Sequence, residues 1–207
     1  MRQLKSRLLA SLITCAALPL AAHAADSDTV QAKWKPQEIR YSYSGFTTAY
    51  SCDAAEDKLK AVLKEVGAHP QTKVRAMGCT GSRPSRNFFI TVTTATPVPA
   101  SEADSAELGK SEREMLARMG SKNAVSQEEF PATWKTIDLS RERKLDLQPG
   151  DCELMEGLSD HVLPKLSVKV VSDKVQCTPK QLSLQTPDLK VSALVRAPSA
   201  DEPKQKT

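Results

Sequence analysis

Cys52 is the residue of this chain whose type and position best suit chemistry. It opens the segment "SCDAAEDKLKAVLKEVG", residues 51–67, whose apolar positions recur at the spacing of one helix face. A thiol at the start of a helix has a lowered pKa and is reactive. The same position also suits one half of a structural disulfide, so the other cysteines must decide between the two interpretations.

Spacing favours disulfides. The cysteines beyond the first 24 residues are Cys52, Cys79, Cys152 and Cys177, with separations of 27 positions in the first pair and 25 in the second. An even number of cysteines in an exported chain favours bridges. A helix over 52–66 and a strand over 73–79 would be about 22 and 23 Å long, so a strand running back along its helix brings Cys79 beside Cys52. We therefore predict the bridges Cys52–Cys79 and Cys152–Cys177.

Thiol–disulfide exchange is the alternative for these cysteines. Enzymes of that class usually hold both cysteines within one turn, as Cys-x-x-Cys, and this chain has no such pair. Zinc is disfavoured because close paired spacing is missing and an oxidising compartment competes for the thiols. The cysteines are interpreted as structural, and a thiol–disulfide redox protein stays as an alternative.

Arginines supply the candidate binding residues. Arg83 and Arg86 flank a proline in the turn-rich "GSRPSRN", and Arg75 lies on the preceding predicted strand. A guanidinium group on a rigid turn can hold a carboxylate or phosphate through two parallel hydrogen bonds. Arg75, Arg83 and Arg86 are the predicted anion or ligand contacts, and a solvated hairpin turn is the competing interpretation.

The other polar residues show no catalytic pattern. We expect His69, in "GAHP", to be exposed or to cap a helix, and His161 to be partly buried on a helix. Carboxylates such as Glu153 and Glu156 are expected on solvent faces of helices. No serine-hydrolase elbow and no phosphate-binding glycine loop occur. The sequence predicts no enzyme, no cofactor and no metal site, with a hydrolase whose carboxylates converge only in the fold as the alternative.

Two similar segments must position these residues. The strand-like "EIRYSYSGFT" precedes the first helix, and "KVRAMGC" and "NFFITVTTATPV" follow it. "TWKTIDLS", "VKVVSDKVQC" and "LKVSALVRA" surround the second helix in the same order, and Pro164 should end that helix near Leu163. The predicted fold class is α+β, a two-layer sandwich with a mostly antiparallel sheet and two main helices on one face. Its building block is a duplicated β-α-β-β unit with one disulfide in each copy.

The amino-terminal segment indicates export. A basic start precedes an apolar run over 8–20 and the small residues of "AHA", which is typical of a secretory signal peptide with cleavage near Ala24. The apolar run is too short to span a membrane. Cys15 is a poor lipidation site because Thr14 precedes it. We therefore expect a periplasmic or secreted protein without a transmembrane segment.

Charge and composition narrow the partners. The predicted signal peptide carries three basic residues and no acidic one, so the net charge of +4 falls to about +1 on cleavage. A nearly neutral chain gives no electrostatic sign of binding to nucleic acid or an anionic membrane. Only 4% of the residues are aromatic, so the core must be mostly aliphatic.

The predicted organisation follows from these segments. It comprises a signal peptide at 1–24, a flexible segment at 25–37, a first unit at 38–98, a linker with a short helix at 99–131, a second unit at 132–197 and a flexible tail at 198–207. The function that this organisation favours is an exported, non-enzymatic binding or assembly module. Its partner would be another exported protein or a small ligand, with no role for nucleic acid.

Overall fold

The computed structural model describes residues 29–79, 83–103, 114 and 129–198. Its strands form one six-stranded sheet in the order β2-β3-β1-β4-β6-β5, in which every neighbouring pair is antiparallel. The α+β class with an antiparallel sheet is thus confirmed. The predicted signal peptide, nearly all of the predicted linker helix and most of the predicted tail lie outside the described residues.

The first half of the chain supplies half of the sheet and one long helix. Its elements are β1 (Thr29–Ser44), α1 (Cys52–Glu65), β2 (Lys73–Met77), β3 (Asn87–Pro99) and α2 (Ala100–Ala103). We call β1, α1, β2 and β3 the first arm.

Local chemistry sets both ends of α1. The Ser51 hydroxyl accepts a hydrogen bond from the Ala54 amide at 3.2 Å, which satisfies one amide of the first turn. At the other end the Ala68 amide donates to the Leu63 carbonyl at 2.9 Å, and Gly67 has φ +80°. This is a Schellman ending, in which glycine is favoured because φ is positive.

The second half of the chain repeats the order strand, helix, strand, strand. Its elements are β4 (Phe130–Asp138), the 3-10 turns η1 (Leu139–Arg141), η2 (Arg143–Leu145) and η3 (Pro149–Asp151), then α4 (Cys152–His161), η4 (Leu163–Lys165), β5 (Val168–Lys174) and β6 (Asp188–Arg196). We call β4, α4, β5 and β6, together with the 3-10 turns between them, the second arm. The regular helix ends before Pro164, which lies in η4.

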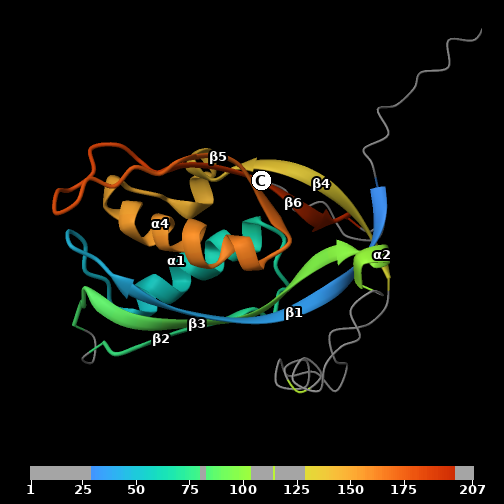
Figure 1. Ribbon diagram of the computed structural model, residues 1–207, viewed down its shortest axis with the longest axis horizontal. Coiled ribbons are helices and arrows are strands. Elements are labelled where there is room, and N and C mark those ends of the chain that lie inside the picture. Colours follow the sequence, from blue (N-terminus) through green and yellow to red (C-terminus); the bar gives the residue numbers. More distant parts are fainter. Residues whose placement is uncertain (1–28, 80–82, 104–113, 115–128, 199–207) are drawn as a thin grey trace, which may run out of the picture.

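The two arms meet along a short seam and then diverge. β1 pairs with β3 from Ala32 to Ser44, but with β4 only from Thr29 to Ala32. Beyond that seam α1 and α4 lie between β1–β3 on one side and β4–β6 on the other (Figure 1). The helices therefore fill the space that the curved sheet leaves between its halves.

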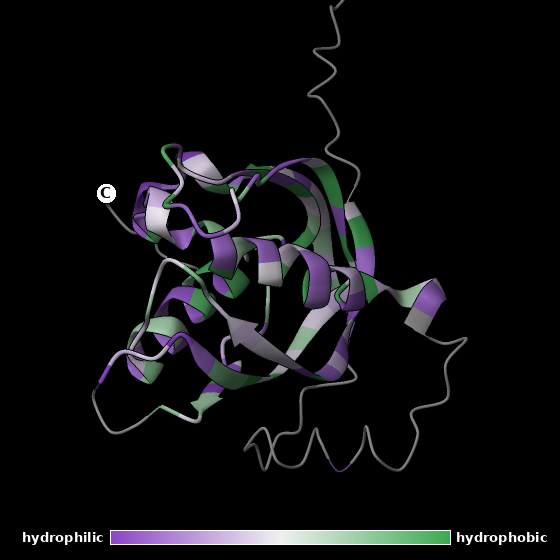
Figure 2. Cartoon of the chain, turned by 60° about the vertical axis from the view of Figure 1, so that its left-hand side comes forward, coloured by the Kyte–Doolittle hydropathy of each residue, from purple (hydrophilic) through white to green (hydrophobic). Residues whose placement is uncertain are grey.

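One apolar cluster joins both arms. Hydrophobic and hydrophilic residues alternate around both helices and along the strands (Figure 2), which leaves one side of each element for the core. The largest fully buried side chains of this cluster are mostly aliphatic, as the composition predicts: Ile39, Leu59, Leu63, Ile90, Leu139, Leu154, Met155, Leu158, Leu163 and Leu189. Tyr41 and Tyr43 are buried in it as well.

The amino-terminal part of β1 differs from its prediction. Residues 29–37 were expected to be flexible, but they belong to β1. They are ordered because a second apolar cluster contains Ala32, Phe130, Ala132 and Leu194, with Val30 and Trp34 packed against it. β1 pairs with β4 only at Thr29–Ala32, so at Pro36 its one neighbouring strand is β3. Proline is tolerated there because the side of β1 that faces away from β3 needs no amide donor.

Each arm carries one disulfide, and both have the partners that the spacing predicts. Cys52 at the start of α1 bonds Cys79, just after β2, with 5.9 Å between the Cα atoms. Cys152 at the start of α4 bonds Cys177, after β5, with a Cα separation of 5.7 Å. Each bridge therefore ties the first turn of a helix to the far end of the strand that follows it.

Candidate functional site

The predicted arginines do not form one cluster. Arg75 lies on β2, whereas Arg83 and Arg86 lie in the connection that leads to β3, and all three side chains are exposed. Arg75 lines a surface depression together with Arg40 of β1, and the two other arginines are not among its lining residues. The structure thus places Arg75 beside the same depression as Arg40, a residue that the sequence analysis did not select.

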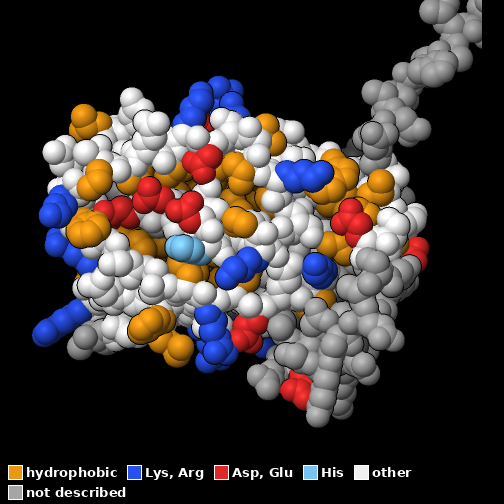
Figure 3. Space-filling view, viewed as in Figure 1, with side chains coloured by type: hydrophobic (Ala, Val, Ile, Leu, Met, Phe, Trp, Pro, Cys, Tyr) orange, Lys and Arg blue, Asp and Glu red, His pale blue; other side chains and the backbone are white. Residues whose placement is uncertain are grey.

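The depression lies on the side of β2, β3 and β1 that faces away from the core, which we call the outer face. Phe89 is 66% exposed and Met77 is 57% exposed. Strand register places Met77 beside Phe89, with Ser42 on the other side. The depression has a volume of about 640 Å³, and Figure 3 shows hydrophobic and basic side chains side by side along β2 and β3.

Two arginines flank these apolar side chains. Arg75 and Arg40 stand on either side of Thr91, one register step from Phe89. Arg40 donates to the Glu38 carboxylate, whereas Arg75 has no ion-pair partner in the described part of the chain. An exposed apolar pair beside an unpaired guanidinium can bind a partner that combines an apolar group with an anionic one.

A second hollow lies at the end of β1 beside α4. It has a volume of about 310 Å³, and its lining includes Glu153, Glu156, Asp160 and His161. Figure 3 shows acidic side chains gathered over α4. Burial, followed by repulsion from Asp160, Glu153 and Asp173, raises the pKa of Glu156 above its usual value. We call this hollow the acidic cleft.

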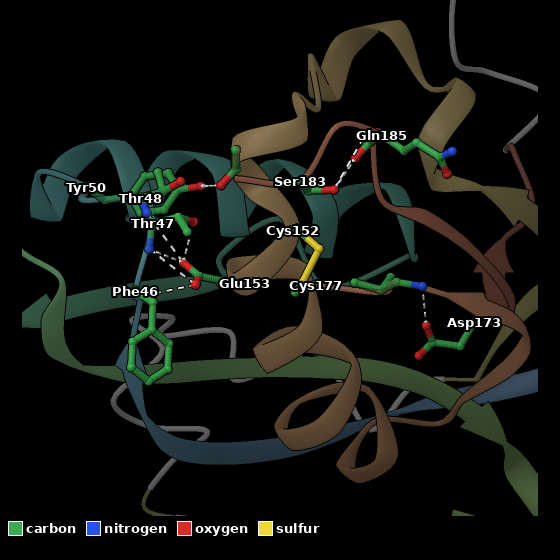
Figure 4. The surroundings of a disulfide bond; sticks show 12 residues. Phe46, Thr47, Thr48, Tyr50, Cys152, Glu153, Asp173, Cys177, Ser183 and Gln185 are labelled. Atoms are coloured by element: carbon green, nitrogen blue, oxygen red, sulfur yellow. Dashed lines mark hydrogen bonds between the residues drawn. A yellow bond between two sulfur atoms is a disulfide. The ribbon is translucent and has the colours of Figure 1, made fainter. Parts of the chain in front are cut away.

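Glu153 already has donors for both carboxylate oxygens. It accepts hydrogen bonds from the Phe46 amide at 2.9 Å, the Thr47 amide at 3.2 Å and the Thr47 hydroxyl at 3.1 Å. A longer bond of 3.4 Å comes from the Thr48 amide (Figure 4). The side chain thereby anchors the connection between β1 and α1 to the start of α4, which is a structural role.

A buried polar cluster joins the starts of the two helices. Asp151 accepts from the Tyr50 hydroxyl and from Lys58 Nζ, both at 2.6 Å, and from the Gln148 amide at 2.7 Å. Its side chain is 5% exposed and that of Lys58 is 21% exposed. Burial and the neighbouring Asp151 raise the pKa of Tyr50. Both carboxylate oxygens of Asp151 already have donors, and we interpret the cluster as structural.

The histidines differ from their predicted environments. His69 is partly buried, with its ring edge-on to Trp34 at 4.8 Å between centroids, and its Nδ1 accepts from the Gln71 amide. Burial, and then the positive charge of Arg196, lowers the pKa of His69. His161 is exposed rather than partly buried, because it lies in the last turn of α4 beside the acidic cleft.

The sequence held a signal for the outer face. Phe88 and Phe89 are consecutive in a strand, and successive side chains of a strand point to opposite faces. One of them must therefore leave the core, and Phe89 does. Lys58 and Asp151 gave no such signal, because nothing local shows which lysine will meet which carboxylate about 90 positions away.

The chain matches no family model, no curated protein and no solved structure. The described helices include none that is both long and apolar enough to cross a bilayer. Within the same residues, no group of three or more histidine, cysteine, aspartate or glutamate side chains is arranged to hold a metal ion. The outer face and the acidic cleft are the two surfaces described above that could bind a partner or substrate.

Proposed function

We propose that this protein is an exported, non-enzymatic binding or assembly module, and that the outer face is its binding surface. The observation that carries the proposal is the exposure of Phe89 and Met77 side by side on a regular sheet face. Single exposed apolar residues are common, but adjacent large ones in a depression are typical of interaction sites. The partner would be another exported protein or a small ligand.

Arginine and aromatic side chains strengthen the argument. Both types are enriched at protein interfaces, where they often supply most of the binding energy. Arg75, Arg40 and Phe89 occupy neighbouring positions of one rigid sheet. Because strands hold them, the surface needs little reordering on binding, and this limits the entropy lost.

The proposal includes an export route and a duplicated architecture. Two disulfides are compatible with an oxidising compartment, and the predicted signal peptide would be cleaved near Ala24 to deliver the chain there. We propose that the arms are copies of one β-α-β-β unit, with the helices of both copies on the inner face of one curved sheet. The support is the shared element order and the matching half-sheets, β2-β3-β1 and β5-β6-β4.

Site-specific photocrosslinking in the exporting cell tests the binding surface. Phe89→benzoylphenylalanine should give a discrete crosslinked product, because the outer face contacts a partner. The matched control is Lys144→benzoylphenylalanine, at an exposed position of η2 in the second arm, which should give none. Equal products at both positions, or none at residue 89, would contradict the proposal.

A hydrolase is the second candidate, and the acidic cleft is the observation that favours it. A carboxyl group with a raised pKa, such as Glu156, suits a general acid. The experiment is a screen of the purified protein on chromogenic glycosides and peptides. Hydrolysis that Glu156→Gln abolishes and Glu142→Gln retains would support this function, and absence of turnover would leave the binding module.

A further inference from the structure

β2 is an edge strand with backbone groups that no strand uses. It has β3 as its neighbour and ends the sheet on that side (Figure 1). The Ala76 amide donates to Glu56 Oε1 of α1 at 2.9 Å, so Ala76 directs its backbone groups away from β3. Backbone groups of a strand alternate in direction, so those of Val74 point the same way.

Three of these edge groups have no partner in the described part of the chain. They are the amide and carbonyl of Val74 and the carbonyl of Ala76. Unpaired groups of this kind are a template for another strand. Glu56 fills the fourth position, where its carboxylate takes the place that a strand carbonyl would take.

A groove follows this edge. It has a volume of about 570 Å³, with Glu56 and Lys60 of α1 on one side and residues 72–77 on the other. Every residue of β2 lines it, so the groove is as long as the strand. An extended segment that enters it would lie between α1 and the unpaired edge of β2, which is a recurring mode of peptide recognition.

The charges beside the groove favour an acidic occupant. Lys60, Lys73 and Arg75 carry positive charge, whereas Glu56 is the acidic residue among the described residues that line the groove. Lys60 lies 3.4 Å from Glu56 Oε2 and 3.7 Å from Asp57 Oδ1, so those carboxylates are already partly neutralised. An incoming carboxylate therefore meets Arg75, the guanidinium beside the groove that has no ion-pair partner in the described part of the chain.

A second copy of this chain fits the edge less well. An antiparallel pair of β2 strands that uses the Val74 and Ala76 groups sets Val74 of one copy opposite Ala76 of the other. Arg75 then lies directly opposite itself. Like charges in that position destabilise a strand pair.

From these observations, and resting on the proposed binding function, we propose that β2 binds an extended acidic segment of another exported polypeptide as a seventh, antiparallel strand. Register fixes the pattern of that segment. An apolar residue lies beside Met77, and acidic residues lie beside Arg75 and Lys73. The segment therefore reads apolar-x-acidic-x-acidic from its amino end.

The probe is the peptide Ser-Leu-Thr-Glu-Thr-Glu-Ser, with blocked ends, added to the ¹⁵N-labelled protein. We expect the amide resonances of Val74 and Ala76 to move most. A peptide with lysine in place of both glutamates should bind at least about tenfold more weakly. N-methylation of both threonines should abolish binding, because these residues face the β2 edge and supply its hydrogen bonds.

Protein variants complete the test. Arg75→Glu should weaken the acidic peptide about tenfold or more, and Lys144→Glu, an exposed change in η2, should leave its affinity unchanged. Equal binding of the lysine peptide, no response at Val74 and Ala76, or dimerisation of the protein through β2 would overturn the inference. If one of these results occurs but residue 89 still gives a crosslink, the strand-addition inference is wrong and the proposed binding function stands. If residue 89 gives no crosslink, the proposed binding function and the inference are both wrong.

Discussion

Lys58 and Asp151 form a largely buried ion pair between the two arms. In Lys58→Met, the Asp151 carboxylate keeps a hydroxyl and an amide donor but loses its cation. Because a buried charge without a partner is strongly destabilising, we expect the free energy of unfolding to fall by about 3 kcal/mol. Urea denaturation measures the change. The control Lys64→Met, an exposed lysine of the same helix, should stay within about 0.5 kcal/mol of wild type, and equal losses would contradict the interpretation.

His69 offers a prediction that depends on pH. A proton NMR titration should find its pKa below the ordinary value of 6.5, because burial and then Arg196 disfavour the imidazolium form. Arg196→Ala should raise that pKa part of the way, since burial remains, and Arg141→Ala should leave it unchanged. His69 has a lower pKa in the folded chain than in the unfolded chain, so the unfolded chain takes up a proton first as pH falls. The stability that neutral His69 contributes is therefore lost as pH falls through the unfolded-state pKa toward the folded-state pKa. An unaltered pKa in Arg196→Ala would exclude a role for that charge.

Single residues were predictable where local pattern decides their place. Cys52 and Cys79 could be paired from the lengths of a helix and a strand. Arg75 could be picked out as a surface arginine, but its neighbour Arg40 could not, because their proximity depends on both strands pairing with β3. Register between distant strands is set by the fold as a whole and has no local signature.

Gly67 determines how α1 ends against the second arm. A Cβ atom at this position would lie 2.9 Å from the Leu194 carbonyl oxygen, in addition to the strain of a φ of +80°. We expect Gly67→Ala to lower the free energy of unfolding by about 2 kcal/mol or more. Gly78→Ala is the matched control, because its φ is also positive, at +103°, but the nearest atom is 3.6 Å away. A smaller loss in Gly67→Ala than in Gly78→Ala would show that the contact with β6 is loose.

The elements could be predicted better than their extents. The helix at 52–66 has a regular apolar face and clear ends, and the structure places α1 within one residue of it. β1 extends nine residues further toward the amino terminus than expected, because polar residues and Pro36 hide a strand that packs against Phe130 and Leu194. Tertiary contacts ordered that segment against its local composition.

The two disulfides stabilise a core that both arms share. Cys52→Ser with Cys79→Ser, and separately Cys152→Ser with Cys177→Ser, should each lower the free energy of unfolding by about 3 kcal/mol. Because one apolar cluster contains residues of both arms, each variant should still unfold in a single transition. Calorimetry and denaturant unfolding measure both quantities. Separate transitions for the two arms would show that they fold independently.

The chain enters and leaves the sheet at one corner. Thr29 of β1 lies opposite Thr133 of β4, which lies opposite Val195 of β6, so two strand spacings, about 10 Å, separate the entry from the exit. A short peptide bridge between residues 29 and 196 would therefore close the polypeptide into a ring without distorting its strands. In such a cyclic protein β2 would still lie at the remote end of the sheet, away from the new linkage.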